Sequence, residues 1–371
     1  MRLTRLWLLL CLVPADLGLA QPLEQSFGQV AVWHHGRAVV KNVALPQSLP
    51  GRVLATPTLQ VSPLPDGLVL GADNCLCYDV SDDRLAAVHA YYYAYTALSN
   101  YNQILRELKL PQIRDVTLSL IKDTTMPTVA TTTFKKHPSI VIRYSSPTID
   151  PFIIDREIGR IILQSLLPHF RWNSMMDNPL SPRLAAEEEG VEEGTANILA
   201  ALELGAVGNV AQTSDTLDAP VAQDVDSFVR LPDLVVTRRQ VAKEITQAPR
   251  FAARYSSYVA KLLRTLDDTA RADYLNQLDP NMTSALINQP LWQVAVRYGF
   301  RSAKILVLRA LAAWSSPDYS YVAYGRELVM QAHLMGPKWA DFLSEEYQRR
   351  GLQVPDARLE LRPQESTGTA R

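Results

Sequence analysis

Four charged residues interrupt an otherwise apolar stretch of the sequence, within the segment DREIGR. Arg156 and Arg160 are four positions apart, and Glu157 directly follows the first arginine. Residues four apart in a helix are neighbours, so these three side chains would lie on one face. A carboxylate beside two guanidinium groups can form ion pairs, and in an open cleft it can also transfer protons. This face is therefore a candidate site.

A solvated charged face with a Glu157–Arg160 pair is the alternative interpretation of the same residues. Isoleucine and leucine flank the segment on both sides, which is typical of a buried helix. Gly159 costs about 1 kcal/mol in a helix interior relative to alanine, so we expect it to have a packing reason.

The segment resembles the HExxH motif of thermolysin-like and fungalysin-like zinc metallopeptidases, the gluzincins. It keeps the glutamate as Glu157 but has Arg156 and Arg160 at the two histidine positions, giving RExGR. Downstream, EEGTANILAA resembles the family segment EGFADYFA. The resemblance implies that Glu193 stands where the family has its third zinc ligand. It places Asn197 where an aspartate orients a zinc-binding histidine.

The resemblance extends over about residues 28–352. DPNMTSALINQPLW is similar to the family pattern in which a histidine steadies the oxyanion, and Asn281 stands at that position. The implied fold is α+β and zincin-like, with an N-terminal mixed β-sheet lobe, active-site helices and a mainly helical C-terminal lobe. TVATTTF corresponds to the substrate-binding edge strand, so the implied peptide-binding residues are Val129, Ala130, Thr131, Thr132, Thr133 and Phe134.

The substitutions remove the chemistry of a zinc peptidase. Arginine stays protonated and offers only donors, so it cannot ligate zinc. Without zinc there is no metal-activated water, and asparagine cannot act as a cationic oxyanion partner. In the family, the charge of Zn²⁺ is balanced by two glutamates, and the two histidines are neutral. In this chain, the charges of two arginines and two glutamates also sum to zero. We therefore predict that both guanidinium groups occupy the place of the metal and pair with Glu157 and Glu193. We expect no cofactor and no bound metal.

Composition and charge narrow the class of protein. The 371 residues are 47% hydrophobic and 20% charged, which is typical of a globular protein with a large core. Lys and Arg total 37 against 38 for Asp and Glu, without the basic excess of a bulk nucleic-acid binder. We therefore expect no nucleic-acid partner.

The N-terminus has the pattern of a secretory signal. Arg2 and Arg5 precede a short apolar core at 6–13, and small residues at Gly18 and Ala20 suit cleavage after Ala20. No later run of about 18 apolar residues follows, so we expect no transmembrane anchor and a secreted or periplasmic protein. Cys75 and Cys77 remain open to three states: a tight disulfide, two free thiols or a surface redox pair.

The remaining pattern divides the chain into five segments. After the signal (1–20), a β-rich segment (21–80) contains Val-rich runs, and a zincin-like lobe (81–205) holds the candidate site helices. A helical lobe (206–353), with a polar loop at about 207–235, precedes a flexible tail (354–371). Strands are expected at 29–33, 37–45, 52–61, 67–71, 116–123, 128–134 and 139–144. Helices are expected from Ser81 or Asp82, from Asp150–Pro151 to about Leu167, from Ser181–Pro182, and over most of 237–350.

Three functions are compatible with these features. The first is an inactive peptidase homologue, a pseudopeptidase, that binds a protein or peptide, with strand addition at 129–134. The second is a zinc-independent hydrolase using Glu157 and Glu193 as an acid–base pair, although nearby arginines would lower both pKa values. The third is a structural subunit of an envelope assembly that never uses the cleft.

Overall fold

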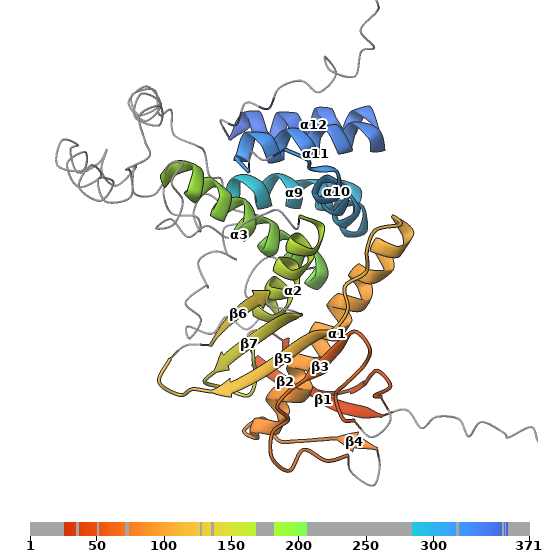
Figure 1. Cartoon of the computed structure of the whole chain (residues 1–371), viewed down its shortest axis with the longest axis vertical. Coiled ribbons are helices and arrows are strands. Elements are labelled where there is room, and N and C mark those ends of the chain that lie inside the picture. Colours follow the sequence, from red (N-terminus) through yellow and green to blue (C-terminus); the bar gives the residue numbers. More distant parts are fainter. Residues whose placement is uncertain are drawn as a thin grey trace, which may run out of the picture.

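The computed structural model describes a mixed α/β protein with its strands toward one end and helices α9–α12 toward the other, and with α2 and α3 between them (Figure 1). The α+β class is therefore confirmed. The described residues are 26–34, 37–49, 52–70, 74–126, 128–134, 137–167, 182–205, 284–316, 319–350, 352 and 354. The strands are β1 (Phe27–His34), β2 (Arg37–Ala44), β3 (Leu59–Val61), β4 (Cys75–Leu76), β5 (Val116–Lys122), β6 (Val129–Phe134) and β7 (Pro138–Tyr144). The helices are α1 (Asp83–Glu107), α2 (Pro151–Leu166), α3 (Pro182–Leu204), α9 (Ala285–Tyr298), α10 (Phe300–Ala313), α11 (Tyr321–Met335) and α12 (Pro337–Arg349).

Both sheets mix parallel and antiparallel pairs. In the three-stranded sheet, with order β2-β1-β4, β1 is antiparallel to β2 and parallel to β4. In the four-stranded sheet, with order β3-β5-β7-β6, the first three strands are parallel and β6 runs antiparallel to β7. β6 is an edge strand of that sheet, as the sequence predicts.

Two predicted strands were wrong. Only Leu59–Val61 of the run 52–61 is a strand, because the chain turns before it: Leu54 has φ 50° and Ala55 bridges to Gln60. Residues 68–70 of the run 67–71 are not a strand, since the described chain gives them no pairing partner and Gly67 lies in a turn with φ 68°. A Val-rich run becomes a strand only where a neighbouring strand can pair with it.

Helix α1 makes hydrogen bonds to strand β1, to helix α3 and to the segment before helix α2. Asp82 caps it, because its carboxylate accepts from the N–H of Arg84 at 2.9 Å. Tyr101 donates to the carbonyl of Leu199 on α3 at 2.6 Å. The fully buried His89 accepts at Nδ1 from the N–H of Ala31 at 3.1 Å, and its Nε2 lies 2.6 Å from the carbonyl oxygen of Ile149. The imidazole thus joins β1 to the turn before α2, and burial lowers its pKa to about 4.

Helices α2 and α3 cross at a glycine. Asp150 caps α2 by accepting from the N–H of Phe152 at 2.9 Å, and Pro151 is its first residue, as the sequence predicts. A Cβ at Gly159 would lie 2.9 Å from the carbonyl oxygen of Ala196 and 3.0 Å from its Cα. No side chain fits there, so the packing reason expected for Gly159 is confirmed. The contact sets how closely α3 approaches α2.

The C-terminal helices pack beyond α3. A Cβ at Gly194 would lie 2.8 Å from the carbonyl oxygen of Ser284, so α3 also lies close to the start of α9. The prediction of helices in the C-terminal lobe is confirmed between 284 and 350. None of the described helices combines the length and apolar composition needed to cross a bilayer. The expected signal peptide, the polar loop at 207–235, Asn281 and the tail beyond Val354 lie outside the described residues.

Candidate functional site

The charged face of α2 is buried. Arg156 is 8% exposed, Glu157 1% and Arg160 6%. Charged side chains are almost never this buried unless they are paired. The alternative of a solvated charged face is therefore wrong.

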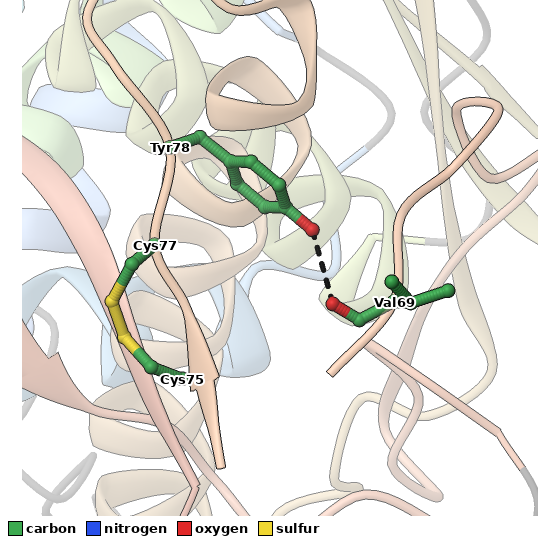
Figure 2. Close-up of a disulfide and its surroundings, with 4 residues drawn as sticks. All are labelled: Val69, Cys75, Cys77 and Tyr78. Atoms are coloured by element: carbon green, nitrogen blue, oxygen red, sulfur yellow. Dashed lines mark hydrogen bonds between the residues drawn. A yellow bond between two sulfur atoms is a disulfide. The ribbon is translucent and has the colours of Figure 1, made fainter. Parts of the chain in front are cut away.

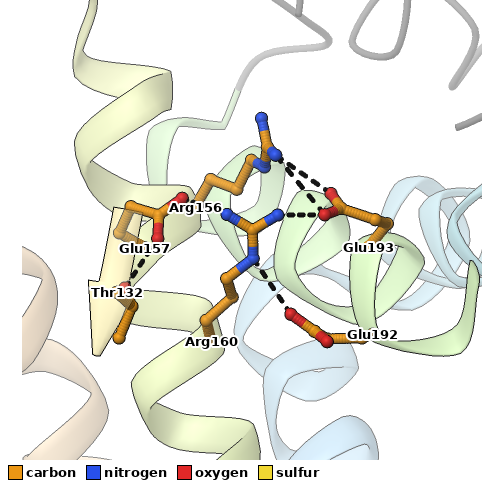
Figure 3. A network of polar contacts seen from close by, with 6 residues as sticks. All are labelled: Thr132, Arg156, Glu157, Arg160, Glu192 and Glu193. Atoms are coloured by element: carbon orange, nitrogen blue, oxygen red, sulfur yellow. Dashed lines mark hydrogen bonds and ion pairs between the residues drawn. The ribbon is translucent and has the colours of Figure 1, made fainter. Parts of the chain in front are cut away.

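Arg160 is the centre of the site (Figure 3). One of its terminal nitrogens, Nη1, donates to Glu157 of the same helix, and Nη2 donates to Glu193 of α3. Its Nε donates to Oε1 of Glu192 at 3.1 Å. The planar guanidinium therefore uses all three of its nitrogens on three different carboxyl groups, which is a geometry that lysine could not reproduce.

Arg156, which lies one turn before Arg160 on α2, pairs with Glu193. Its Nη2 lies 3.1 Å from Oε2 of Glu193, while Arg160 binds Oε1 of that carboxylate. Nη2 of Arg156 also donates to Oε1 at 3.5 Å, so the two arginines share this one carboxylate. The predicted ion pairs are present: Arg160 pairs with both Glu157 and Glu193, and Arg156 pairs with Glu193.

The edge strand contributes directly to the site. Thr132 of β6 donates from Oγ1 to Oε2 of Glu157 at 2.6 Å. Glu157 therefore has one oxygen bonded to Arg160 and the other bonded to Thr132 of β6. Thr131, Thr133 and Phe134 of the same strand are exposed, so β6 connects the buried network to the surface.

Sequence reasoning missed the roles of Glu192 and Thr132. Glu192 directly precedes Glu193, and the available signal was that a guanidinium with five donors can satisfy more than two carboxylates. Thr132 stands in the predicted edge strand, but nothing in its spacing indicates which side chain it meets. Both contacts depend on how α3 and β6 are placed against α2.

Glu192 adds a fifth ionisable group to the cluster of Arg156, Glu157, Arg160 and Glu193. Burial raises the pKa of the Glu192 carboxyl well above its usual range; Glu193 and Glu157 add to this, and Arg160 opposes it. Burial alone would lower the pKa of the Arg160 guanidinium, but Glu157, Glu193 and Glu192 outweigh it and raise that pKa. The sequence-based count of zero covers Arg156, Arg160, Glu157 and Glu193 and leaves Glu192 out. If all five groups were ionised, the cluster would carry one net negative charge, and the raised pKa of Glu192 opposes that state.

Asn197 lies on the next turn of α3 and is fully buried. Its side-chain amide makes no hydrogen bond to any residue that the structure describes. It therefore takes no part in the cluster. Asn281, the remaining predicted site residue, is not among the described residues.

The arrangement offers donors where a metal site needs lone pairs. Every carboxyl group of the cluster faces a guanidinium, and guanidinium cannot ligate a cation. In the part of the chain that the structure describes, no group of three or more His, Cys, Asp or Glu side chains is arranged to hold a metal ion.

No protein-family model matches this chain, and no curated protein matches its sequence.

Proposed function

We propose that this chain is a secreted or periplasmic pseudopeptidase: an inactive, zincin-like homologue of the thermolysin-like and fungalysin-like metallopeptidases that binds a protein or peptide. One observation supports it most strongly. Arg156 and Arg160, at the two histidine positions of HExxH, both pair with Glu193, at the position of the third zinc ligand. The two guanidinium groups stand in for the metal.

The surrounding elements also support the proposal. The resemblance implies a substrate-binding edge strand, and β6 lies at the edge of its sheet and is bonded to Glu157 through Thr132. Among the described residues no strand pairs with the outer side of β6. Its outward N–H and C=O groups could therefore accept an extended peptide by strand addition.

The buried state of the carboxyl groups argues against a hydrolase. Glycoside-type acid–base chemistry needs two carboxyl groups that face a substrate. Glu157 is 1% exposed and both its oxygens are already bonded, one by Thr132 and the other by Arg160. The network thus uses the groups that such a reaction would require.

Restoring the histidines tests the ancestry of the site. The double variant Arg156→His/Arg160→His should bind about one equivalent of zinc, because two imidazoles and Glu193 form a three-ligand set. The triple variant with Glu193→Gln should lose that zinc. Circular dichroism checks that each variant is folded. A folded double variant that binds no zinc would contradict the correspondence with HExxH.

Blocking the edge strand tests the binding role. Peptides selected against the purified protein from a displayed library of extended sequences serve as probes. Thr131→Lys/Thr133→Lys places charge on the exposed face of β6 and should weaken their binding about tenfold or more. Gln348→Lys, on the exposed side of α12, is the control and should have no effect. If no selected peptide depends on β6, the envelope-structural alternative is favoured.

A further inference from the structure

A second feature with its own chemistry lies far from the α2–α3 cluster in the sequence. Cys75 of β4 and Cys77 form a disulfide across a single intervening residue, with 5.3 Å between their Cα atoms. Figure 2 shows the bond on the segment that leads to Tyr78, whose hydroxyl points to Val69. The proposed pseudopeptidase function gives this bond no role.

The disulfide does not anchor its surroundings. A cross-link stabilises a fold mainly by restricting the unfolded chain, and a loop of three residues restricts it very little. Other contacts hold both ends. Before the bond, the N–H of Phe27 donates to the carbonyl of Asn74 at 2.9 Å. After it, Tyr78 donates to the carbonyl of Val69 at 3.2 Å and packs under Arg84, whose Cζ is 4.5 Å from the ring centroid.

The two sulfur atoms differ in access. Cys75 is 9% exposed and lies in the sheet opposite Phe27 of β1, whereas Cys77 is exposed. Thiol–disulfide exchange depends on which sulfur an attacking thiolate can reach. An external thiolate reaches Cys77 Sγ, so Cys75 Sγ is the leaving group.

Exposed apolar side chains occur on the segments linked to the bond. Phe27, the sheet partner of Cys75, is 43% exposed, and Val69, the partner of Tyr78, is 66% exposed. Val80, three residues after Cys77, is 49% exposed. Such surfaces suit the apolar side chains of an unfolded polypeptide, which is also the kind of molecule that presents free cysteines.

We propose that the Cys75–Cys77 pair is a thiol–disulfide exchange site for cysteine-bearing unfolded polypeptides. A substrate thiolate attacks Cys77 Sγ, the bond between the two protein sulfurs breaks, and its electron pair stays on Cys75 Sγ, which then takes a proton from water. A second substrate thiolate attacks the substrate sulfur of the mixed disulfide and releases the Cys77 thiolate. The substrate dithiol is oxidised by two electrons, and the Cys75–Cys77 pair is reduced by two.

The test uses the purified protein and a reduced peptide with two cysteines as the probe. Alkylation followed by mass spectrometry identifies the mixed disulfide, and peptide oxidation is followed over time. We expect the peptide to be joined to Cys77, and its oxidation to be about tenfold or more faster than with equimolar oxidised glutathione. A peptide joined to Cys75, or a rate no higher than that of oxidised glutathione, would overturn the proposal.

A variant separates exchange from a structural role. The double variant Cys75→Ser/Cys77→Ser should keep the melting temperature of the parent within a few degrees and lose all peptide oxidation. Unfolding of this variant would also overturn the proposal, since the bond would then hold the fold. Tyr78→Phe, which removes the bond to Val69 but no sulfur, is the matched control and should keep the exchange reaction.

Discussion

The guanidinium of Arg160 on α2 donates a hydrogen bond to the carboxylate of Glu193 on α3, 33 residues further along the chain. The pair joins two helices that cross where Gly159 meets Ala196. Both side chains are buried, so neither can turn to water if the other is removed. A set of predictions follows from this dependence.

Replacing Arg160 by methionine should lower the free energy of unfolding by about 3–5 kcal/mol, because Glu157 and Glu193 would lose their shared partner in the interior. Urea denaturation measures the change. The control is Arg301→Met, which removes an exposed pair with Glu107 and should cost less than about 1 kcal/mol. The double variant Arg156→Met/Arg160→Met should also be destabilised; unchanged stability would contradict the ion-pair account.

Replacing Glu192 by glutamine should have a small effect, within about 1 kcal/mol. Glutamine has the shape of the protonated acid and keeps an oxygen for Nε of Arg160. Glu193→Gln should cost more, about 2–3 kcal/mol, because it removes the carboxylate that two arginines share. Equal losses for the two glutamines would show that Glu192 is ionised and that the cluster is not neutral.

The pH dependence of stability should also differ between the parent and the Glu192→Gln variant. A carboxyl group whose folded pKa is raised binds its proton more tightly in the folded state, so stability falls as pH rises above about 4.5, the unfolded value. The parent should therefore lose more stability than Glu192→Gln between pH 5 and pH 8. Urea denaturation across that range compares them. Parallel pH profiles would rule out a raised pKa at Glu192.

Replacing Gly159 by alanine should destabilise the protein by about 1–3 kcal/mol, although alanine is the better helix former. The added Cβ would meet the backbone of Ala196, which cannot move aside. Gly325→Ala on α11 is the control: there the nearest atom is the side-chain Cγ2 of Val354 at 3.0 Å, which can give way. Thermal melting compares the two. A stabilised Gly159→Ala variant would mean that α2 and α3 lie further apart.

Acidification should weaken the fold through His89. Its pKa is about 4 in the folded state and about 6.5 when unfolded, so its contribution is complete above pH 6.5 and is lost as pH falls toward 4. The loss from this group at pH 5 is about 2 kcal/mol. His89→Gln keeps a donor and an acceptor but does not titrate, so its stability should fall less between pH 7 and pH 5. Identical losses in parent and variant would exclude His89 as the cause.

The parts of the site that could be predicted from sequence are those that local chemistry decides. Asp150 and Pro151 mark the start of α2 because capping needs only neighbouring residues. The pairing of Arg156 and Arg160 with Glu193 is not local, and it was expected because the resemblance places all three residues at metal-ligand positions. The role of Glu192 could not be predicted, since it depends on how α3 is placed against α2, and residues far apart in the sequence decide that placement. The strand predicted at 67–71 was wrong for the same reason, because strand pairing depends on residues far away in the sequence.

Metal analysis of the purified protein, with zinc added and then dialysed away, tests the central claim most directly. The arginines should exclude the ion, so less than about a tenth of an equivalent should remain. Stoichiometric zinc that is lost in Glu193→Ala would contradict the account, because Glu193 would then be a metal ligand and not the shared partner of Arg156 and Arg160.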